Sequence, residues 1–335
     1  MQKRTDAQSA APGSIATKSG AKPSVFIDGE AGTTGIEIRE RLVPLAQIDV
    51  RSIAPEKRKD PAARKAMMAE VDLVVLCLPD DAAKAAVALA SELGEEAPRI
   101  IDASTAHRVA SGWVYGFAEM DAAQAKAIAG AKRVTNPGCY PTGAIALVRP
   151  LVDAGLVAPD HPITVNAVSG YSGGGKSMIE AYETGGAPAF ELYGLTLEHK
   201  HVPELQLYAK LARRPIFVPS VGNFRKGMLV SVPLHLDALP GQPSARQLEA
   251  ALVEHYAGAR FVKVVPTADP SAKGGRLEAE ALNGTNLLEL RVFANEAHRQ
   301  AVLVAKLDNL GKGASGAAVQ NIAVMLGIDT ALSPP

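Results

Sequence analysis

The chain has 335 residues, of which 47% are hydrophobic and 21% charged, so it is long enough for two domains with large buried cores. Lys and Arg together number 35, as do Asp and Glu, which gives a formal net charge of zero. A neutral chain lacks the long-range attraction expected of a general nucleic-acid or membrane-surface binder. We therefore expect neither partner, and any phosphate site must be built locally.

Cysteine usage indicates the compartment. The two cysteines, Cys77 and Cys139, cannot form a disulfide framework, and Cys77 lies inside the apolar run 73–78. A reducing, cytoplasmic location fits best. Residues 1–22 are rich in Ala, Ser, Gly and Lys without apolar periodicity, which predicts a disordered extension.

The first expected strand, Ser24–Asp28, leads into a glycine turn and then a helical pattern over 36–42. Strand, glycine turn and helix form the context of a dinucleotide-binding loop, in which glycines let the backbone approach the pyrophosphate at the helix N-terminus. The spacing is G-x-x-G-x-x-G rather than the commoner G-x-G-x-x-G, so a plain glycine-rich turn stays open as an alternative. The candidate cofactor-binding residues here are Gly29, Gly32, Thr33, Thr34 and Gly35.

The second expected strand, 49–54, ends without the acidic residue that often binds the ribose hydroxyls of NAD. Instead Ser52 is followed by Lys57 and Arg58. Hydroxyl and basic groups there would suit a 2′-phosphate, which favours NADPH over NADH. The alternative is a solvated basic surface turn.

Further parallel strands are expected at 72–78 and 99–102, with an Ala-rich helix at 80–93 between them. Polar residues after such strands lie at the carboxyl edge of the sheet, where α/β proteins bind ligands. Arg108 follows the second strand and could bind a carboxylate or phosphate; a surface ion pair is the alternative. His107 is interpreted as a loop residue.

Cys139 lies at another strand–turn–helix junction. A short strand at 131–135 precedes the turn Asn136-Pro137-Gly138, and apolar residues then recur at helical spacing from 145 to 152. The positive end of a helix favours a thiolate, so we interpret Cys139 as a nucleophile. A small buried apolar residue is the alternative.

Two segments of the next region carry candidate groups. A strand at 163–168 enters a glycine loop in which Ser169, Gly170 and Lys176 could bind an anion, although a flexible loop is equally compatible. The segment Glu198-His199-Lys200-His201-Val202-Pro203-Glu204 follows. We expect no metal site here; His199 is better used as the acid/base partner of Cys139, oriented by Glu204.

The remaining pattern predicts strands at 216–220, 228–236, 287–293 and 301–306 with a helix near 244–256, an α+β unit whose largely antiparallel sheet could pair subunits. A final helix carries an apolar stripe at 319, 322, 323 and 326. Its expected partner is the N-terminal domain, which would bring the preceding loop, with Gly311, Lys312 and Gly313, to the cofactor.

The predicted fold class is therefore α/β: a Rossmann-type parallel-sheet domain joined to an α+β domain. The extension covers 1–22, the NADP-binding domain 23–139 and 310–330, and the catalytic and dimerisation domain 140–309. A homodimer or homotetramer is expected.

Four stretches resemble one family, the N-acetyl-γ-glutamyl-phosphate reductases, and more closely its shorter subtype. They are the glycine turn, residues 136–142, residues 199–204 and the loop 308–316, and the resemblance spans roughly 23–330. It implies a semialdehyde dehydrogenase-like fold and NADPH-dependent reduction of an acyl phosphate to an aldehyde through a cysteine thioester. Cys139 then matches the family's nucleophile, and His199 and Glu204 match its proposed acid/base pair.

Other functions stay open. Aspartate-semialdehyde dehydrogenases share the chemistry, but their nucleophile usually follows Asn, whereas Gly138 stands here. A lysine-pathway reductase of a one-carbon-longer acyl phosphate shares nearly all these motifs. A non-catalytic dinucleotide-sensing protein would need the glycine turn but not Cys139 and His199.

Overall fold

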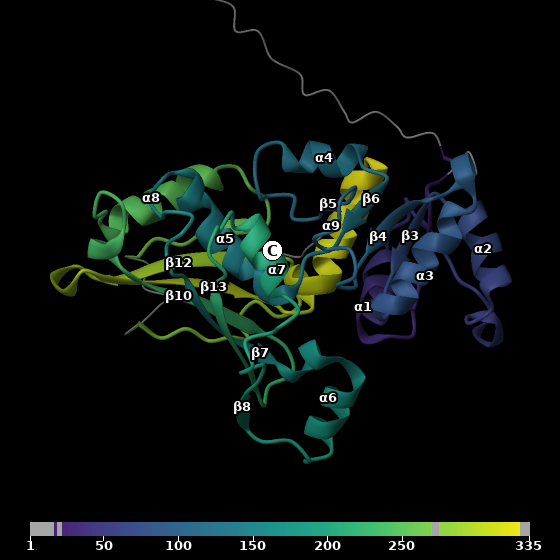
Figure 1. The fold of residues 1–335 in the computed structure, drawn as a ribbon. Helices are drawn as coiled ribbons and strands as arrows, with labels where there is room; N and C mark the ends of the chain where they lie inside the picture. Colours follow the sequence, from purple (N-terminus) through teal and green to yellow (C-terminus); the bar gives the residue numbers. More distant parts are fainter. Residues whose placement is uncertain (1–16, 19–21, 268, 270–274, 329–335) are drawn as a thin grey trace, which may run out of the picture.

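The computed structural model describes residues 17–18, 22–267, 269 and 275–328. The predicted extension over 1–22 falls almost entirely outside these residues. The described chain forms two sheets (Figure 1), a six-stranded one in the N-terminal part and a seven-stranded one in the C-terminal part. Among the described helices, none is long and apolar enough to cross a bilayer.

The six-stranded sheet is parallel throughout, with strand order β2-β1-β3-β4-β6-β5. Its strands are β1 (Ser24–Asp28), β2 (Asp49–Arg51), β3 (Leu73–Leu76), β4 (Arg99–Asp102), β5 (Val114–Tyr115) and β6 (Arg133–Thr135). The helices around it are α1 (Thr33–Leu42), α2 (Pro61–Glu70), α3 (Asp80–Ser91), α4 (Gln124–Gly130) and α9 (Gly316–Leu326). The predicted Rossmann-type sheet is confirmed.

Alternate residues of β1 reach opposite faces of this sheet, as the period of a strand requires. Val25 and Ile27 belong to a core cluster that includes residues of α1 and α9. Phe26 belongs to a second cluster with residues of α2 and α3. Both faces are thus covered, which explains why β3 is an unbroken apolar run.

The seven-stranded sheet is mixed, with order β11-β12-β13-β10-β7-β9-β8. Its strands are β7 (Thr164–Gly170), β8 (Phe190–Leu192), β9 (Ile216–Gly222), β10 (Met228–His235), β11 (Val262–Val264), β12 (Leu288–Asn295) and β13 (Gln300–Leu307). The pairs β7–β9 and β11–β12 are parallel and the other four antiparallel, so the predicted largely antiparallel sheet is confirmed. The accompanying helices are α5 (Cys139–Asp153), α6 (Gly175–Glu183), α7 (Val202–Tyr208) and α8 (Ala245–His255).

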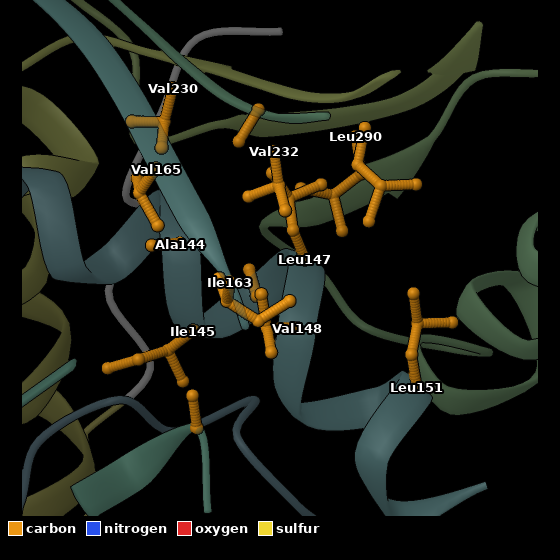
Figure 2. Close-up of a cluster of buried hydrophobic side chains, with 14 of the residues drawn as sticks. Ala144, Ile145, Leu147, Val148, Leu151, Ile163, Val165, Val230, Val232 and Leu290 are labelled. Atoms are coloured by element: carbon orange, nitrogen blue, oxygen red, sulfur yellow. The ribbon is translucent and has the colours of Figure 1, made fainter. Parts of the chain in front are cut away.

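Helix α5 is the central helix of this second part. Figure 2 shows its apolar side chains, among them Leu147 and Val148, packed toward residues of β7, β10 and β12 such as Val165 and Val232. Gly143 allows this approach, because a β-carbon there would lie 2.9 Å from a methyl group of Val230. The burial of α5 fixes the position of its first residue, Cys139.

Helix α9 returns the chain to the first sheet, as its apolar stripe predicts. Val319, Ile322 and Leu326 are buried in the same cluster as Val25 and Ile38. In Figure 1 this helix, in yellow, lies beside β5, β6 and α4 rather than with β13, which precedes it. The loop before α9 must therefore cross from one sheet to the other.

Candidate active site

A cavity of about 350 Å³ brings together segments from both parts of the chain. The glycine turn contributes Thr33 and Thr34, and the loop before α9 contributes Leu310 and Gly313. The remaining lining residues include the Cys139 turn, both histidines of the 199–201 segment, and the loop before α6. Segments that the sequence predicts separately thus line a single site.

The glycine turn has the shape that a dinucleotide requires. Gly29 has a φ of +94°, and a β-carbon there would collide with the carbonyl oxygen of Cys77. A β-carbon at Gly35 would collide with the carbonyl oxygen of Gly29. Gly32 is the N-cap of α1 and supplies no side chain to its first N–H groups, which leaves them for an anion. The residues present therefore fit a bound dinucleotide.

Cys139 is the first residue of α5, with Gly138 as N-cap. A β-carbon at Gly313 would lie 2.8 Å from Cβ of Cys139, so the loop before α9 rests directly on the cysteine. Gly313, a predicted cofactor residue, thus also contacts the candidate nucleophile.

Burial opposes the thiolate that the sequence predicts for Cys139. Burial raises the pKa of the Cys139 thiol from 9.0 to about 11. Arg108 and the backbone N–H of Tyr140 favour the thiolate but offset only part of this effect. Placement at a helix start does not outweigh desolvation here.

Glu204 does not orient His199, contrary to the sequence prediction. Arg108 Nη1 donates to Glu204 Oε1 at 2.5 Å, and the Tyr115 hydroxyl donates to Oε2 at 2.9 Å. The backbone N–H of Gly138 also donates to Oε2, at 3.1 Å. Glu204 is 1% exposed, so its carboxylate serves these three donors in the interior, directly behind the Cys139 turn.

Arg108 is both an ion-pair partner and a lining residue. It pairs with Glu204 rather than with a surface acid, and its guanidinium is buried. Its Nε has no hydrogen-bond partner among the described residues. A buried guanidinium with a donor to spare could bind an anionic substrate group.

The two histidines lie together in the cavity wall. Nδ1 of His199 accepts the backbone N–H of His201 at 3.1 Å, so in neutral His199 the proton is on Nε2. Burial, with Lys200 and Arg108 nearby, lowers the pKa of His199 to about 4. His201 is buried more deeply than His199, and burial and Arg108 hold its pKa well below the usual range. Sequence reasoning missed His201, although the His-x-His spacing was a signal for it.

The predicted substrate loop is only partly in place. Ser169 and Gly170, at the end of β7, line the cavity. Lys176, the second residue of α6, is exposed and is not among the lining residues. Tyr140, Tyr193 and Asn309, which the sequence did not single out, line the cavity as well.

Lys312 does not face the cofactor turn. Its Nζ is bound to both Glu119 oxygens, at 2.9 and 2.8 Å, and to Gln320 Oε1 at 2.7 Å. The side chain is 1% exposed and lies over the rings of Phe117 and Phe261. Gly311 is likewise structural, since a β-carbon there would collide with the carbonyl oxygen of Thr285. Of this predicted trio, Gly313 alone is among the cavity-lining residues.

The predicted basic turn is formed by partly different residues. Ser52 and Arg58 both contact the carboxylate of Glu30, and Arg39 of α1 joins them. Lys57 is exposed at the end of the 3₁₀ turn Pro55–Lys57. Sequence reasoning missed Arg39 because it lies on α1, outside the basic turn. In the part of the chain that the structure describes, no group of three or more His, Cys, Asp or Glu could hold a metal ion.

The fold and the site define an oxidoreductase of the semialdehyde dehydrogenase type. The family model described as "Semialdehyde dehydrogenase, NAD binding domain" matches residues 35–128, and "Semialdehyde dehydrogenase, dimerisation domain" matches 139–309. The chain belongs to this family, whose cofactor is a nicotinamide dinucleotide.

Closer relatives narrow the assignment to the N-acetyl-γ-glutamyl-phosphate reductases. A protein of that name from Chelativorans sp. (strain BNC1) is 56% identical over 306 residues, covering 90% of this chain and 97% of the relative. One from Mesorhizobium japonicum is 54% identical and covers 92% and 100%, and one from Brucella ovis is 55% identical and covers 91% and 99%.

Solved structures confirm the fold. Aspartate semialdehyde dehydrogenase II from Vibrio cholerae, in complex with ASA, has a TM-score of 0.68 at 16% identity and covers 91% of this chain and 98% of that one. The enzyme from Candida albicans with NADP has a TM-score of 0.64 at 14% identity, with 91% and 98% covered.

Titration of Cys139 tests the burial effect. Because the pKa of its thiol is raised to about 11, the thiolate fraction should rise about tenfold per pH unit between pH 7 and 10. We expect the iodoacetamide alkylation rate of the ligand-free protein to rise with this slope, measured by mass spectrometry of the Cys139 peptide. Cys77, whose pKa burial raises to about 12, is the internal control and should react more slowly. A plateau for Cys139 near pH 7 would show a stabilised thiolate instead.

Proposed function

We propose that this chain catalyses the NADPH-dependent reduction of N-acetyl-γ-glutamyl phosphate to N-acetylglutamate 5-semialdehyde and phosphate, a step of arginine biosynthesis. The observation that carries the proposal is the placement of Cys139 at a helix start, in one cavity with the glycine turn and two histidines. The names of relatives at 54–56% identity supply the substrate. The unpaired thiols of Cys77 and Cys139 suit the reducing cytoplasm expected from the sequence.

The first half of the reaction is acyl transfer. Cys139 Sγ forms a bond to the acyl carbon, the carbon–oxygen bond to phosphate breaks, and the thiol proton passes to a base. With pKa values of about 11 for Cys139 and about 4 for His199, both groups are neutral at pH 7. Transfer of the thiol proton during nucleophilic attack by Cys139 therefore suits this cavity better than attack by a pre-formed thiolate.

The second half converts the thioester to the aldehyde. Gly29, Gly32, Thr33, Thr34 and Gly35 would hold NADPH, which would supply a hydride to the thioester carbon. We assign His199 as the hydrogen-bond donor to the carbonyl oxygen of the thioester. Its Nδ1 accepts the backbone N–H of His201, so its Nε2–H is available for this bond. The carbon–sulfur bond then breaks, and the Cys139 sulfur takes back the proton that the base accepted in the first half, which restores the thiol. His201, in the same wall, could accept the thiol proton.

Three groups remain as candidates for the anionic parts of the substrate: Arg108, Ser169 and Gly170. All three line the cavity, and Arg108 supplies a buried positive charge. Glu204 acts in this scheme by positioning Arg108 and the backbone of Gly138.

The sheet face turned away from α5 supports a homodimer. Residues of β10 alternate: Val230 and Val232 pack in the core with α5, whereas Leu229 and Ser231 line a shallow groove on the other side. Phe190, Leu192 and Val302 border the same groove and are 57%, 50% and 38% exposed. An apolar sheet face of this kind in a domain of the dimerisation family suits a second copy of the chain.

The reverse reaction tests the proposed activity. NADPH formation from NADP⁺ and phosphate should occur with N-acetylglutamate semialdehyde and be absent with aspartate semialdehyde. Cys139→Ser should abolish it while NADP⁺ still binds; substantial activity in this variant would refute the thioester route. Turnover of aspartate semialdehyde alone would move the chain to the other substrate. If neither semialdehyde is turned over, two alternatives remain: a reductase of the one-carbon-longer acyl phosphate and a non-catalytic dinucleotide-sensing protein.

Single variants of His199 and His201 test which of the two imidazoles acts as the acid/base group. His199→Asn should lower kcat by ~10²–10⁴-fold, the range for a general acid/base, with a smaller change in KM. His201→Asn is the matched variant, since it removes the neighbouring ring from the same wall. A loss of only a few-fold for His199→Asn, together with a large loss for His201→Asn, would transfer the role to His201.

A charged side chain introduced on this sheet face tests the proposed dimer. Phe190→Arg should shift the protein toward monomers in analytical ultracentrifugation, because it buries a cation in an apolar contact. Val253→Arg, at a 49% exposed valine of α8, is the control and should leave the mass unchanged. An unchanged mass for Phe190→Arg would exclude this face.

A further inference from the structure

A buried carboxylate occupies the end of the sheet where the adenosine ribose of a dinucleotide binds. Glu30 belongs to the glycine turn and is 8% exposed. Its Oε1 lies 2.7 Å from Arg58 Nη2, and its Oε2 lies 3.1 Å from Arg39 Nη1. The hydroxyl of Ser52 donates to Oε2 at 2.8 Å and accepts from Arg39 Nη1 at 2.7 Å.

The position of these side chains in the fold indicates which part of a dinucleotide they would contact. Ser52 directly follows β2, which pairs with β1, the strand that leads into the glycine turn. At the end of this second strand, Rossmann proteins bind the ribose 2′ position: an acid holds the hydroxyls of NAD, and an arginine accommodates the 2′-phosphate of NADP. This chain has both kinds of group there, because the acid arrives from the turn rather than from β2.

The two arginines are far more exposed than the glutamate that they contact. The side chains of Arg39 and Arg58 are 41% and 40% exposed, and their guanidiniums meet at one carboxylate. A phosphate dianion between them would receive charge-assisted, forked hydrogen bonds. As long as Glu30 holds both, its charge cancels part of theirs and repels the phosphate.

We propose that Glu30 is a specificity-determining residue that opposes the 2′-phosphate. Its carboxylate is the resting counter-ion of Arg39 and Arg58, and NADP(H) must take these guanidiniums from it. Glu30 thereby lowers affinity for the phosphorylated cofactor and moderates its advantage over NAD(H). This inference rests on the dinucleotide site of the proposed function but not on the chemistry at Cys139.

Binding of nucleotides with and without a 2′-phosphate measures the effect of Glu30 on affinity for that phosphate. Isothermal titration calorimetry with adenosine 2′,5′-bisphosphate (2′,5′-ADP) and with 5′-AMP compares ligands that differ only in the 2′-phosphate. Glu30→Gln should tighten 2′,5′-ADP and NADP⁺ binding by about three- to tenfold and change the binding of 5′-AMP and NAD⁺ by less than about twofold. Arg58→Gln should weaken 2′,5′-ADP selectively.

The control is Glu56→Gln, which removes the same charge two residues from Arg58, at an exposed position of the 3₁₀ turn. It should leave the ratio of the two affinities unchanged. Should Glu30→Gln fail to fold, Glu30→Asp withdraws the carboxylate by one methylene and should tighten 2′,5′-ADP in the same direction.

Two outcomes overturn the inference: 2′,5′-ADP affinity that is unchanged or weaker in a folded Glu30 variant, or an equal gain in Glu56→Gln. Wild-type protein that binds none of the four ligands would instead refute the dinucleotide site itself, and with it the proposed function. The two failures are therefore distinguishable.

Discussion

The ion pair between Arg108 and Glu204 is the interaction on which the candidate site depends. It joins the loop after β4 to α7 across 96 residues of sequence, and neither partner is more than 8% exposed. The same carboxylate holds the N–H of Gly138, the N-cap of α5. A buried charge whose partner is removed typically costs a protein ~3–5 kcal/mol, so the pair fixes the Cys139 turn against both sheets. Gly138 is required there, because a β-carbon would lie 2.5 Å from Arg108 Nη1.

Desolvation then sets the chemistry. Burial raises the pKa of Cys139 and lowers that of His199, which leaves a neutral thiol and a neutral imidazole in the same cavity at pH 7. Such a pair is protected from adventitious reactions until a substrate arrives. Charge develops during acyl transfer, where Arg108 and the N-terminal N–H groups of α5 can stabilise it more strongly than they would in water.

Local patterns predicted most of the fold and the outline of the site. The strand–glycine–helix pattern at Gly29 and the strand–turn–helix pattern at Cys139 are encoded in adjacent residues, and the stripe on α9 predicted its packing partner. Pairings between distant residues were not predictable in this way. Nothing near Lys312 reveals Glu119 as its partner, and nothing near Glu204 reveals Arg108. The helix-terminus argument for Cys139 failed for the same reason, since burial is a property of the whole fold.

Trapping of the acyl-enzyme tests the central claim, that Cys139 carries the acyl group in this cavity. The protein would be incubated with N-acetylglutamate semialdehyde and NADP⁺ without phosphate, quenched in acid, digested and examined by mass spectrometry. We expect one N-acetylglutamyl adduct on the Cys139 peptide, formed with NADPH in equal amount and absent from Cys139→Ser. NADPH formation without an adduct on Cys139, or with an adduct elsewhere, would contradict the account.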